Sequence, residues 1–197
     1  MEKQSPNVNC LTGVERQSVK RVGTEAPHPA ALRAAWDGSK ILLATHHMLV
    51  IGYGNSLRSD DGVGPKVADI IEGLKLHGVG TLSCDVLTPE LAEPIARADE
   101  VIFVDAAVDS PKKVRLRPLA SADSSQIMAH AADPRTMLAV ARDVFGHAPR
   151  AWWLTIPVEN IGIGDKLSEL AQQGLACAVE MIQKLGREPY WRSACCC

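Results

Sequence analysis

The chain has 197 residues, of which 46% are hydrophobic, and its formal net charge is −2. That length suits one domain with enough apolar side chains to bury a core. The near-neutral charge does not indicate a nucleic-acid partner, and no apolar run approaches the roughly 18 residues that a membrane helix needs. The amino terminus lacks a secretory apolar segment, and the six cysteines show neither zinc-site nor disulfide spacing. We therefore expect a cytoplasmic protein with no nucleic-acid or membrane partner.

The pattern of the chain divides it into three parts. Residues 1–47 are polar, carry scattered charges and show no sustained hydrophobic period, which predicts a disordered amino-terminal extension. Residues 48–188 show regular strand and helix patterns and form the predicted domain. Residues 189–197 follow a polar turn and end in three cysteines, so we expect them to form a carboxyl-terminal tail.

The first half of the domain alternates between strand and helix patterns. Met48–Tyr53 is an apolar run typical of a buried parallel strand, and Pro65–Leu74 places Val, Ile and Leu on one helical face. Gly80–Leu87 is predicted to be a second strand. A helix over residues 88–98 should follow, bent or shortened by Pro94.

The second half contains two strands in succession. Val101–Asp105 is apolar until its last residue, and Lys113–Pro118 alternates basic and apolar residues. The link between them is too short for a parallel crossover, so the second should be an antiparallel edge strand. A helix over residues 133–146, with an Asp-Pro start and a glycine stop, precedes the strand Ala151–Ile156. The final helix is predicted to end at Gly186.

This order of elements, β-α-β-α-β-β-α-β-α, predicts an α/β fold. We expect three layers, α/β/α, around a mostly parallel five-stranded sheet with one antiparallel edge strand. Ligands of such sheets bind at the carboxyl ends of the strands, where the strand order reverses.

The loop over residues 52–64 follows the first strand and is rich in glycine and acids. A dinucleotide-binding loop would need a third glycine where Leu57 stands, and Asp60 and Asp61 would repel a pyrophosphate. The loop therefore suits a cation or a proton better than a phosphate. Carboxylates at a helix start also have a structural explanation, through the helix dipole, and this applies most to Asp60.

A second acid should meet this loop. Asp105 is the first polar residue at the carboxyl end of a buried strand, where a charge is costly unless it is paired or used. If the first and third strands are neighbours, Asp61 and Asp105 face one another across the switch point.

His130 precedes a helix that starts near Pro134, although spacing alone does not separate it from the other histidines. Two carboxylates and an imidazole make a site for a borderline metal such as nickel or zinc, with coordination positions left open. The sequence contains neither a G-x-S-x-G nor an H-E-x-x-H pattern. Asp61, Asp105 and His130 are therefore the candidate site residues.

The stretch from Ile51 to Gly64 resembles the opening motif of the hydrogenase maturation proteases, G-x-G-N-x-L-x-x-D-(D/E)-x-x-G. Further stretches resemble the later motifs of these proteases in order and spacing. They are Val104-Asp105-Ala106, Ala129-His130, and Ile156 to Glu159 with Gly164 and Leu167-Ser168. The resemblance therefore covers roughly residues 48–186.

This resemblance implies an endopeptidase, aspartic-type or metal-dependent, that removes the carboxyl-terminal extension of a nickel-iron hydrogenase large-subunit precursor after nickel insertion. Asp61, Asp105 and His130 would be its metal-recognising and catalytic positions, and the nickel would be supplied by the substrate. Two routes to hydrolysis stay open: attack by a carboxylate or metal-bound water, or general-base catalysis by an aspartic dyad. The alternative function is a non-catalytic metal-binding maturation chaperone of the same fold.

Overall fold

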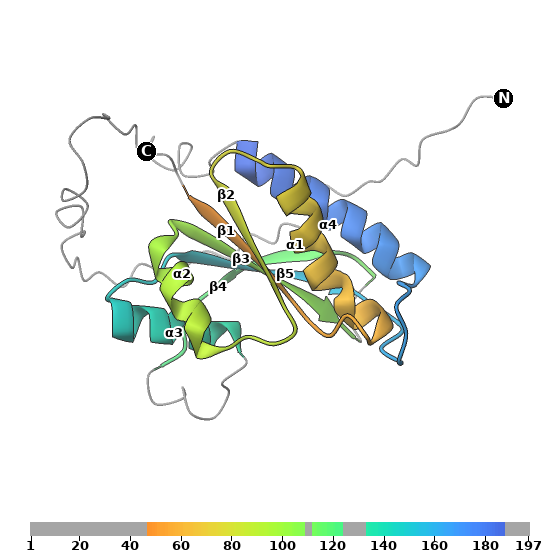
Figure 1. Ribbon diagram of the computed structural model, residues 1–197, viewed down its shortest axis with the longest axis horizontal. Coiled ribbons are helices and arrows are strands. Elements are labelled where there is room, and N and C mark those ends of the chain that lie inside the picture. Colours follow the sequence, from red (N-terminus) through yellow and green to blue (C-terminus); the bar gives the residue numbers. More distant parts are fainter. Residues whose placement is uncertain (1–46, 109–111, 124–132, 188–197) are drawn as a thin grey trace. The chain divides into compact units, whose positions relative to one another are not determined.

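The computed structural model describes residues 47–108, 112–123 and 133–187. Within them lies a five-stranded sheet in the order β2-β1-β3-β5-β4, in which all pairs are parallel except β4 with β5 (Figure 1). The predicted fold class is confirmed. The strands are β1 (Met48–Tyr53), β2 (Val79–Cys84), β3 (Glu100–Ala107), β4 (Arg115–Leu119) and β5 (Arg150–Pro157). The predicted extension, apart from His47, and the whole of the predicted tail lie outside the described residues.

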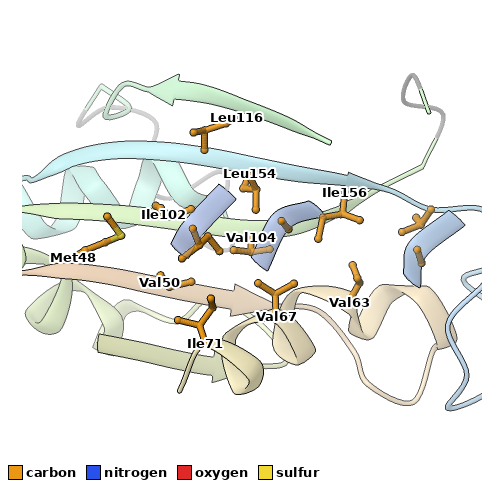
Figure 2. Packing of buried hydrophobic residues seen from close by; sticks show 14 residues of the cluster. Met48, Val50, Val63, Val67, Ile71, Ile102, Val104, Leu116, Leu154 and Ile156 are labelled. Atoms are coloured by element: carbon orange, nitrogen blue, oxygen red, sulfur yellow. The ribbon is translucent and has the colours of Figure 1, made fainter. Parts of the chain in front are cut away.

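Helices cover both faces of this sheet. They are η2 (Ser59–Gly62), α1 (Val63–Gly73), η3 (Pro89–Leu91), α2 (Ala92–Arg97), α3 (Pro134–Phe145) and α4 (Glu169–Arg187). One buried cluster joins the sheet to α1 and α4, and Figure 2 shows its labelled side chains, which come from α1 and from the strands β1, β3, β5 and β4. The other cluster joins the opposite face to α2 and α3. None of the described helices has the length and apolar content that a membrane crossing requires.

Local sequence signals explain where α3 begins and ends. The Asp133 carboxylate accepts a hydrogen bond of 2.8 Å from the backbone N–H of Arg135, and Pro134 occupies the first helical position. Gly146 ends the helix with a left-handed φ of 74°, which glycine adopts without strain. Both ends agree with the sequence prediction.

Several boundaries and one helix face differ from the prediction. β2 ends at Cys84, three residues before the predicted Leu87. α1 begins at Val63, two residues before the predicted start, and its Ile70 and Leu74 are exposed rather than in the core. Val63, Val67 and Ile71, spaced four apart, form its buried face instead. α4 continues through Gly186 to Arg187, the last described residue, so Gly186 does not end the helix as predicted.

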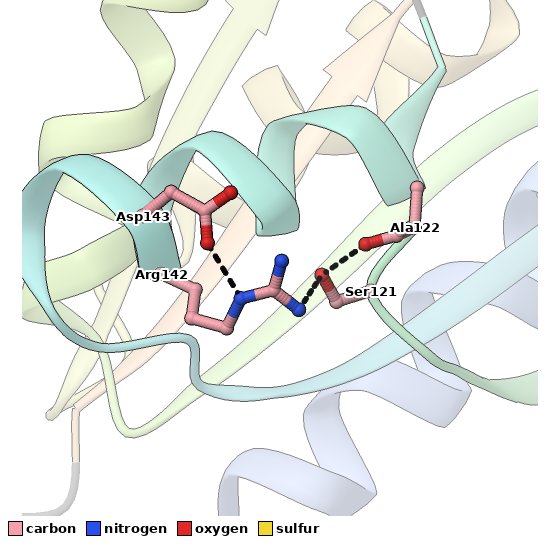
Figure 3. Close-up of polar contacts among 4 residues, drawn as sticks. All are labelled: Ser121, Ala122, Arg142 and Asp143. Atoms are coloured by element: carbon pink, nitrogen blue, oxygen red, sulfur yellow. Dashed lines mark hydrogen bonds and ion pairs between the residues drawn. The ribbon is translucent and has the colours of Figure 1, made fainter. Parts of the chain in front are cut away.

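The edge strand β4 pairs with β5, which follows α3 in the chain, and so it does not lie beside β3. A hydrogen bond links the chain after β4 to α3. The guanidinium of Arg142 donates to the Ser121 hydroxyl at 3.1 Å (Figure 3). The backbone N–H of Ala122 also donates to the carbonyl of Arg135 in the first turn of α3, at 3.0 Å. The chain is thus held against α3 before residue 124 and again at Asp133.

Candidate active site

The carboxyl ends of β1 and β3 form the switch point of the sheet. The chain leaves β1 through α1 for β2 and returns through α2 to β3 on the other side of β1. Close backbone packing draws this corner together: a Cβ on Gly64 would lie 2.5 Å from the carbonyl oxygen of Tyr53 and 2.6 Å from that of Val104. The start of α1 therefore rests directly on both strand ends, which only glycine allows.

Asp60 anchors two distant parts of the chain at this corner. Its fully buried carboxylate accepts hydrogen bonds from the backbone N–H groups of Glu159, Asn160 and Ser168, at 3.1, 2.9 and 2.6 Å, and from the Ser168 hydroxyl at 2.7 Å. Burial alone would raise the pKa of Asp60, but these hydrogen bonds outweigh it and lower the pKa. Asp60 is therefore a structural residue, and it acts through these bonds rather than through the helix dipole.

Asp61 lies beside Asp60 but is only partly buried. Its carboxylate Oδ2 accepts a hydrogen bond of 2.9 Å from the backbone N–H of Asn55, which closes the loop between β1 and η2. Gly54 supports this closure with a φ of 135°, and a Cβ there would lie 2.1 Å from the Asp61 carbonyl oxygen. The loop thus fixes the backbone and one carboxylate oxygen of Asp61.

Asp105 lies near the carboxyl end of β3 and is half-buried. The hydroxyl of Tyr53, the last residue of β1, donates to its Oδ2 at 2.8 Å. Burial raises the pKa of Asp105, and the negative charge of Asp61 raises it further, against the lowering effects of Tyr53, Ala106 and Trp153. The structure therefore brings Asp61 and Asp105 close enough to interact electrostatically, as the sheet topology predicts.

Trp153 completes the surroundings of Asp105. Its indole N–H lies near enough to lower the pKa of both Asp105 and Tyr53, yet Nε1 is buried and makes no hydrogen bond with any described residue. The guanidinium of Arg117 lies 5.6 Å from the centre of its ring. Trp152 and Trp153 are both partly buried.

His130, the third predicted site residue, lies outside the described residues. Within the described ranges no group of three His, Cys, Asp or Glu side chains is gathered as a metal site. Burial and Asp105 raise the pKa of Tyr53 far above the usual range, and Asp133 is close enough for its charge to add to this effect. The described chain therefore resumes near Tyr53, three residues after His130.

Sequence reasoning missed Tyr53 and Trp153 as parts of this site. A signal existed in the strand alternation, because Tyr53 follows Ile51 and Asp105 follows Phe103 on the same face of neighbouring strands. A phenol and a carboxylate at two adjacent strand ends therefore share one side of the sheet. What the alternation does not give is which of them bond, since that depends on the rotamers.

The fold and these acids define a three-layer α/β/α protein with paired carboxylates at its switch point. No protein-family model matches the chain, and no curated protein matches it. Solved structures do match. The hydrogenase maturating endopeptidase HybD from E. coli aligns with a TM-score of 0.59 and 20% sequence identity, over 73% of this chain and 94% of that one.

Two archaeal structures give the same result. The NiFe hydrogenase maturation protease HycI from Thermococcus kodakarensis aligns with a TM-score of 0.60 and 20% identity, over 74% of this chain and 96% of that one. The maturation protease HybD from the same organism aligns with a TM-score of 0.55 and 22% identity, over 71% and 99%. The chain therefore has the fold of the hydrogenase maturation proteases, which is the fold that its loop motif predicted.

Proposed function

We propose that this protein is an endopeptidase that removes the carboxyl-terminal extension of a nickel-iron hydrogenase large-subunit precursor after nickel insertion. The observation that carries the proposal is the meeting of Asp61 and Asp105 at the switch point of this fold. Structures with the same fold are named as hydrogenase maturation endopeptidases. We expect the reaction to take place in the cytoplasm.

The donor set suits recognition of nickel that is already part of the substrate. Asp61 and Asp105 supply carboxylate oxygens, and His130 would supply an imidazole, a combination that borderline metals accept. His130 lies three residues before Asp133, a chain length of about 11 Å at most, which is compatible with its reaching the site. Three protein ligands leave positions for groups that the precursor brings.

The environment of Asp105 also supports a role in proton transfer. Burial and the charge of Asp61 raise its pKa, and a carboxylate with a raised pKa is a stronger general base at neutral pH. In the proposed reaction the substrate's nickel orients the scissile peptide bond at the site. Asp61, Asp105 and His130 hold that metal, and Asp105 also takes the proton of the attacking water and returns it to the leaving amine.

A cleavage assay tests this function directly. The purified protein is incubated with a nickel-loaded large-subunit precursor, and mass spectrometry follows the appearance of the shortened product. We expect a product with the wild type and with Asp69→Ala, an exposed aspartate of α1, and none with Asp105→Ala or Asp61→Ala. A precursor without nickel should stay uncut.

The role of His130 needs its own variant pair. We expect His130→Ala to abolish cleavage, whereas His77→Ala, at an exposed position between α1 and β2, should cleave like the wild type. Stable complex formation without any product from the wild type would instead favour the non-catalytic maturation chaperone. Cleavage that survives Asp105→Ala would exclude the proposed site.

A further inference from the structure

The two acids of the candidate site are held in different ways. Asp61 Oδ2 is held by the backbone N–H of Asn55, six residues earlier in the same loop. Asp105 Oδ2 is held by the hydroxyl of Tyr53, a side chain that belongs to the neighbouring strand. Any residue at position 55 other than proline would supply the first donor, but only the side chain at position 53 supplies the second.

Tyr53 is well placed to fix the orientation of Asp105. It is partly buried at the end of β1, and its ring packs against the apolar cluster that joins the sheet to α2 and α3. The central strands β1 and β3 are paired along five residues up to Gly52 and Val104. This pairing fixes the distance between the backbones that carry the Tyr53 hydroxyl and the Asp105 carboxylate. A hydrogen bond between two such rigid elements restricts the carboxylate to one rotamer.

Trp153 provides an independent observation on the same carboxylate. Its buried Nε1–H makes no hydrogen bond with any described residue, although polar groups in such surroundings are normally paired. Its ring belongs to the same apolar cluster as Tyr53, on the strand that pairs with β3. The N–H is close enough to Asp105 and Tyr53 to lower the pKa of both, so a ligand-bound arrangement of the carboxylate would accept it.

We propose that Tyr53 is a positioning residue that holds Asp105 by one carboxylate oxygen and leaves its other oxygen available to the metal of the substrate, and that Trp153 is a second positioning residue that donates to the oxygen held by Tyr53 once the ligand is bound. Hydrogen bonds to a ligating carboxylate orient it, and removal of such a partner typically weakens metal binding or activity about 10- to 100-fold. The inference rests on the proposed function, because it assumes that Asp105 is a metal ligand. It adds two residues that lie outside the predicted metal-binding set.

The main test is Tyr53→Phe, which removes one hydroxyl and keeps the ring. Nickel chloride is added to the isotopically labelled full-length protein, and NMR follows the paramagnetic broadening of the amide signals of Asn55, Asp61 and Ala106. We expect the dissociation constant for Ni²⁺ to rise about 10- to 100-fold in the variant. In the cleavage assay, kcat should fall by a similar factor. KM should change little, because the substitution leaves unchanged the surface of this protein on which the precursor docks.

Trp153→Phe tests the second donor and has a matched control next to it in the chain. Trp152 lies in the same strand on the opposite face, and its indole N–H donates to Glu100 at the other end of β3, at 3.1 Å. We expect Trp153→Phe to weaken Ni²⁺ binding and lower kcat, by less than Tyr53→Phe does. Trp152→Phe should change stability at most and leave both readings unchanged.

The outcomes separate this inference from the proposed function. A wild type that binds Ni²⁺ at these amides but never cleaves would refute the function, and the Ni²⁺ affinities alone would then decide the inference. Equal Ni²⁺ affinity and equal kcat in the wild type and Tyr53→Phe would overturn the inference while the function stands. A wild type that neither binds Ni²⁺ nor cleaves would overturn both.

Discussion

Two aspartates at one corner of the molecule have opposite surroundings. Asp60 is fully buried, and four hydrogen-bond donors from Glu159, Asn160 and Ser168 surround its carboxylate. Asp105 is half-buried and accepts one side-chain hydrogen bond, from Tyr53, while the N–H of Trp153 stays unpaired nearby. One acid is saturated with donors, and the other is not.

The pKa values of the two acids follow this difference. Burial acts to raise both, but the donors around Asp60 reverse its effect and lower the pKa, whereas those around Asp105 do not. A saturated carboxylate stabilises the fold and has no free lone pair directed at a ligand. An unsaturated one with a raised pKa costs stability, and such groups are concentrated at functional sites. The comparison therefore makes Asp60 a structural residue, and it supports the proposed role of Asp105 in the chemistry.

The largest expected effect is on activity, from Asp105→Asn. The amide can still accept from Tyr53 but cannot take a proton or bind a metal as an anion, so kcat for the precursor should fall about 10²- to 10⁴-fold. Stability at pH 7 should stay equal or rise, because the raised pKa means that folding disfavours the ionised Asp105. Kinetics and urea unfolding of the same preparation measure both effects. A variant that unfolds more easily and still cleaves would reverse the assignment.

Asp60→Ala should show the opposite pattern. It leaves the donors of Glu159, Asn160 and Ser168 buried without their acceptor, so we expect the free energy of unfolding to fall by about 3 kcal/mol or more. Urea titration followed by circular dichroism measures the loss. At a temperature where the variant remains folded, it should still cleave the precursor. Unchanged stability with lost cleavage would place Asp60 in the active site instead.

The fold was predictable because its local signals agree with one another. The apolar runs of β1 and β3, and the Asp-Pro start and glycine end of α3, each depend on neighbouring residues. The pairing of β4 with β5 was not predictable from the short link that follows β3, because that link is satisfied by any antiparallel neighbour. The exposed Ile70 and Leu74 show the same limit, since helical periodicity indicates an apolar stripe but not which edge of it the core covers.

For the site, topology was sufficient to bring two residues together. Asp61 and Asp105 follow neighbouring parallel strands, so their meeting follows from strand order. The role of Asp60 depends on bonds to residues about 100 positions away, and that of Tyr53 on a bond across 52 positions. Such contacts depend on tertiary geometry and leave no local pattern. The metal-binding role of Asp61, Asp105 and His130 remains a prediction.

Ser168→Ala separates the contribution of the Ser168 hydroxyl from that of the Ser168 backbone N–H, both of which donate to Asp60. The hydroxyl donates to Asp60 at 2.7 Å and accepts from the backbone N–H of Ala171 at 3.2 Å, so it also caps the first turn of α4. Alanine removes both bonds but keeps the backbone donor, and we expect a loss of about 2 kcal/mol. Thermal unfolding measures it against Ser83→Ala, an exposed serine of β2 that should change stability by about 0.5 kcal/mol or less. Equal losses in the two variants would show that the Ser168 hydroxyl contributes nothing specific.

The smallest expected effect is the pH dependence of the Asp60 contribution, because protonation removes only the part that depends on charge. The pKa of Asp60 in the folded protein lies below its ordinary value of 3.8, so the ionised carboxylate stabilises the fold fully above that value. This contribution is lost as the pH falls through the folded-state pKa.

The stability difference between the wild type and Asp60→Asn should therefore be constant near neutral pH and shrink below about pH 4. Asp105 titrates in both proteins and cancels from the difference. A difference that stayed constant down to about pH 2 would mean that the hydrogen bonds of Asp60 do not depend on its charge. The two aspartates would then differ in packing alone.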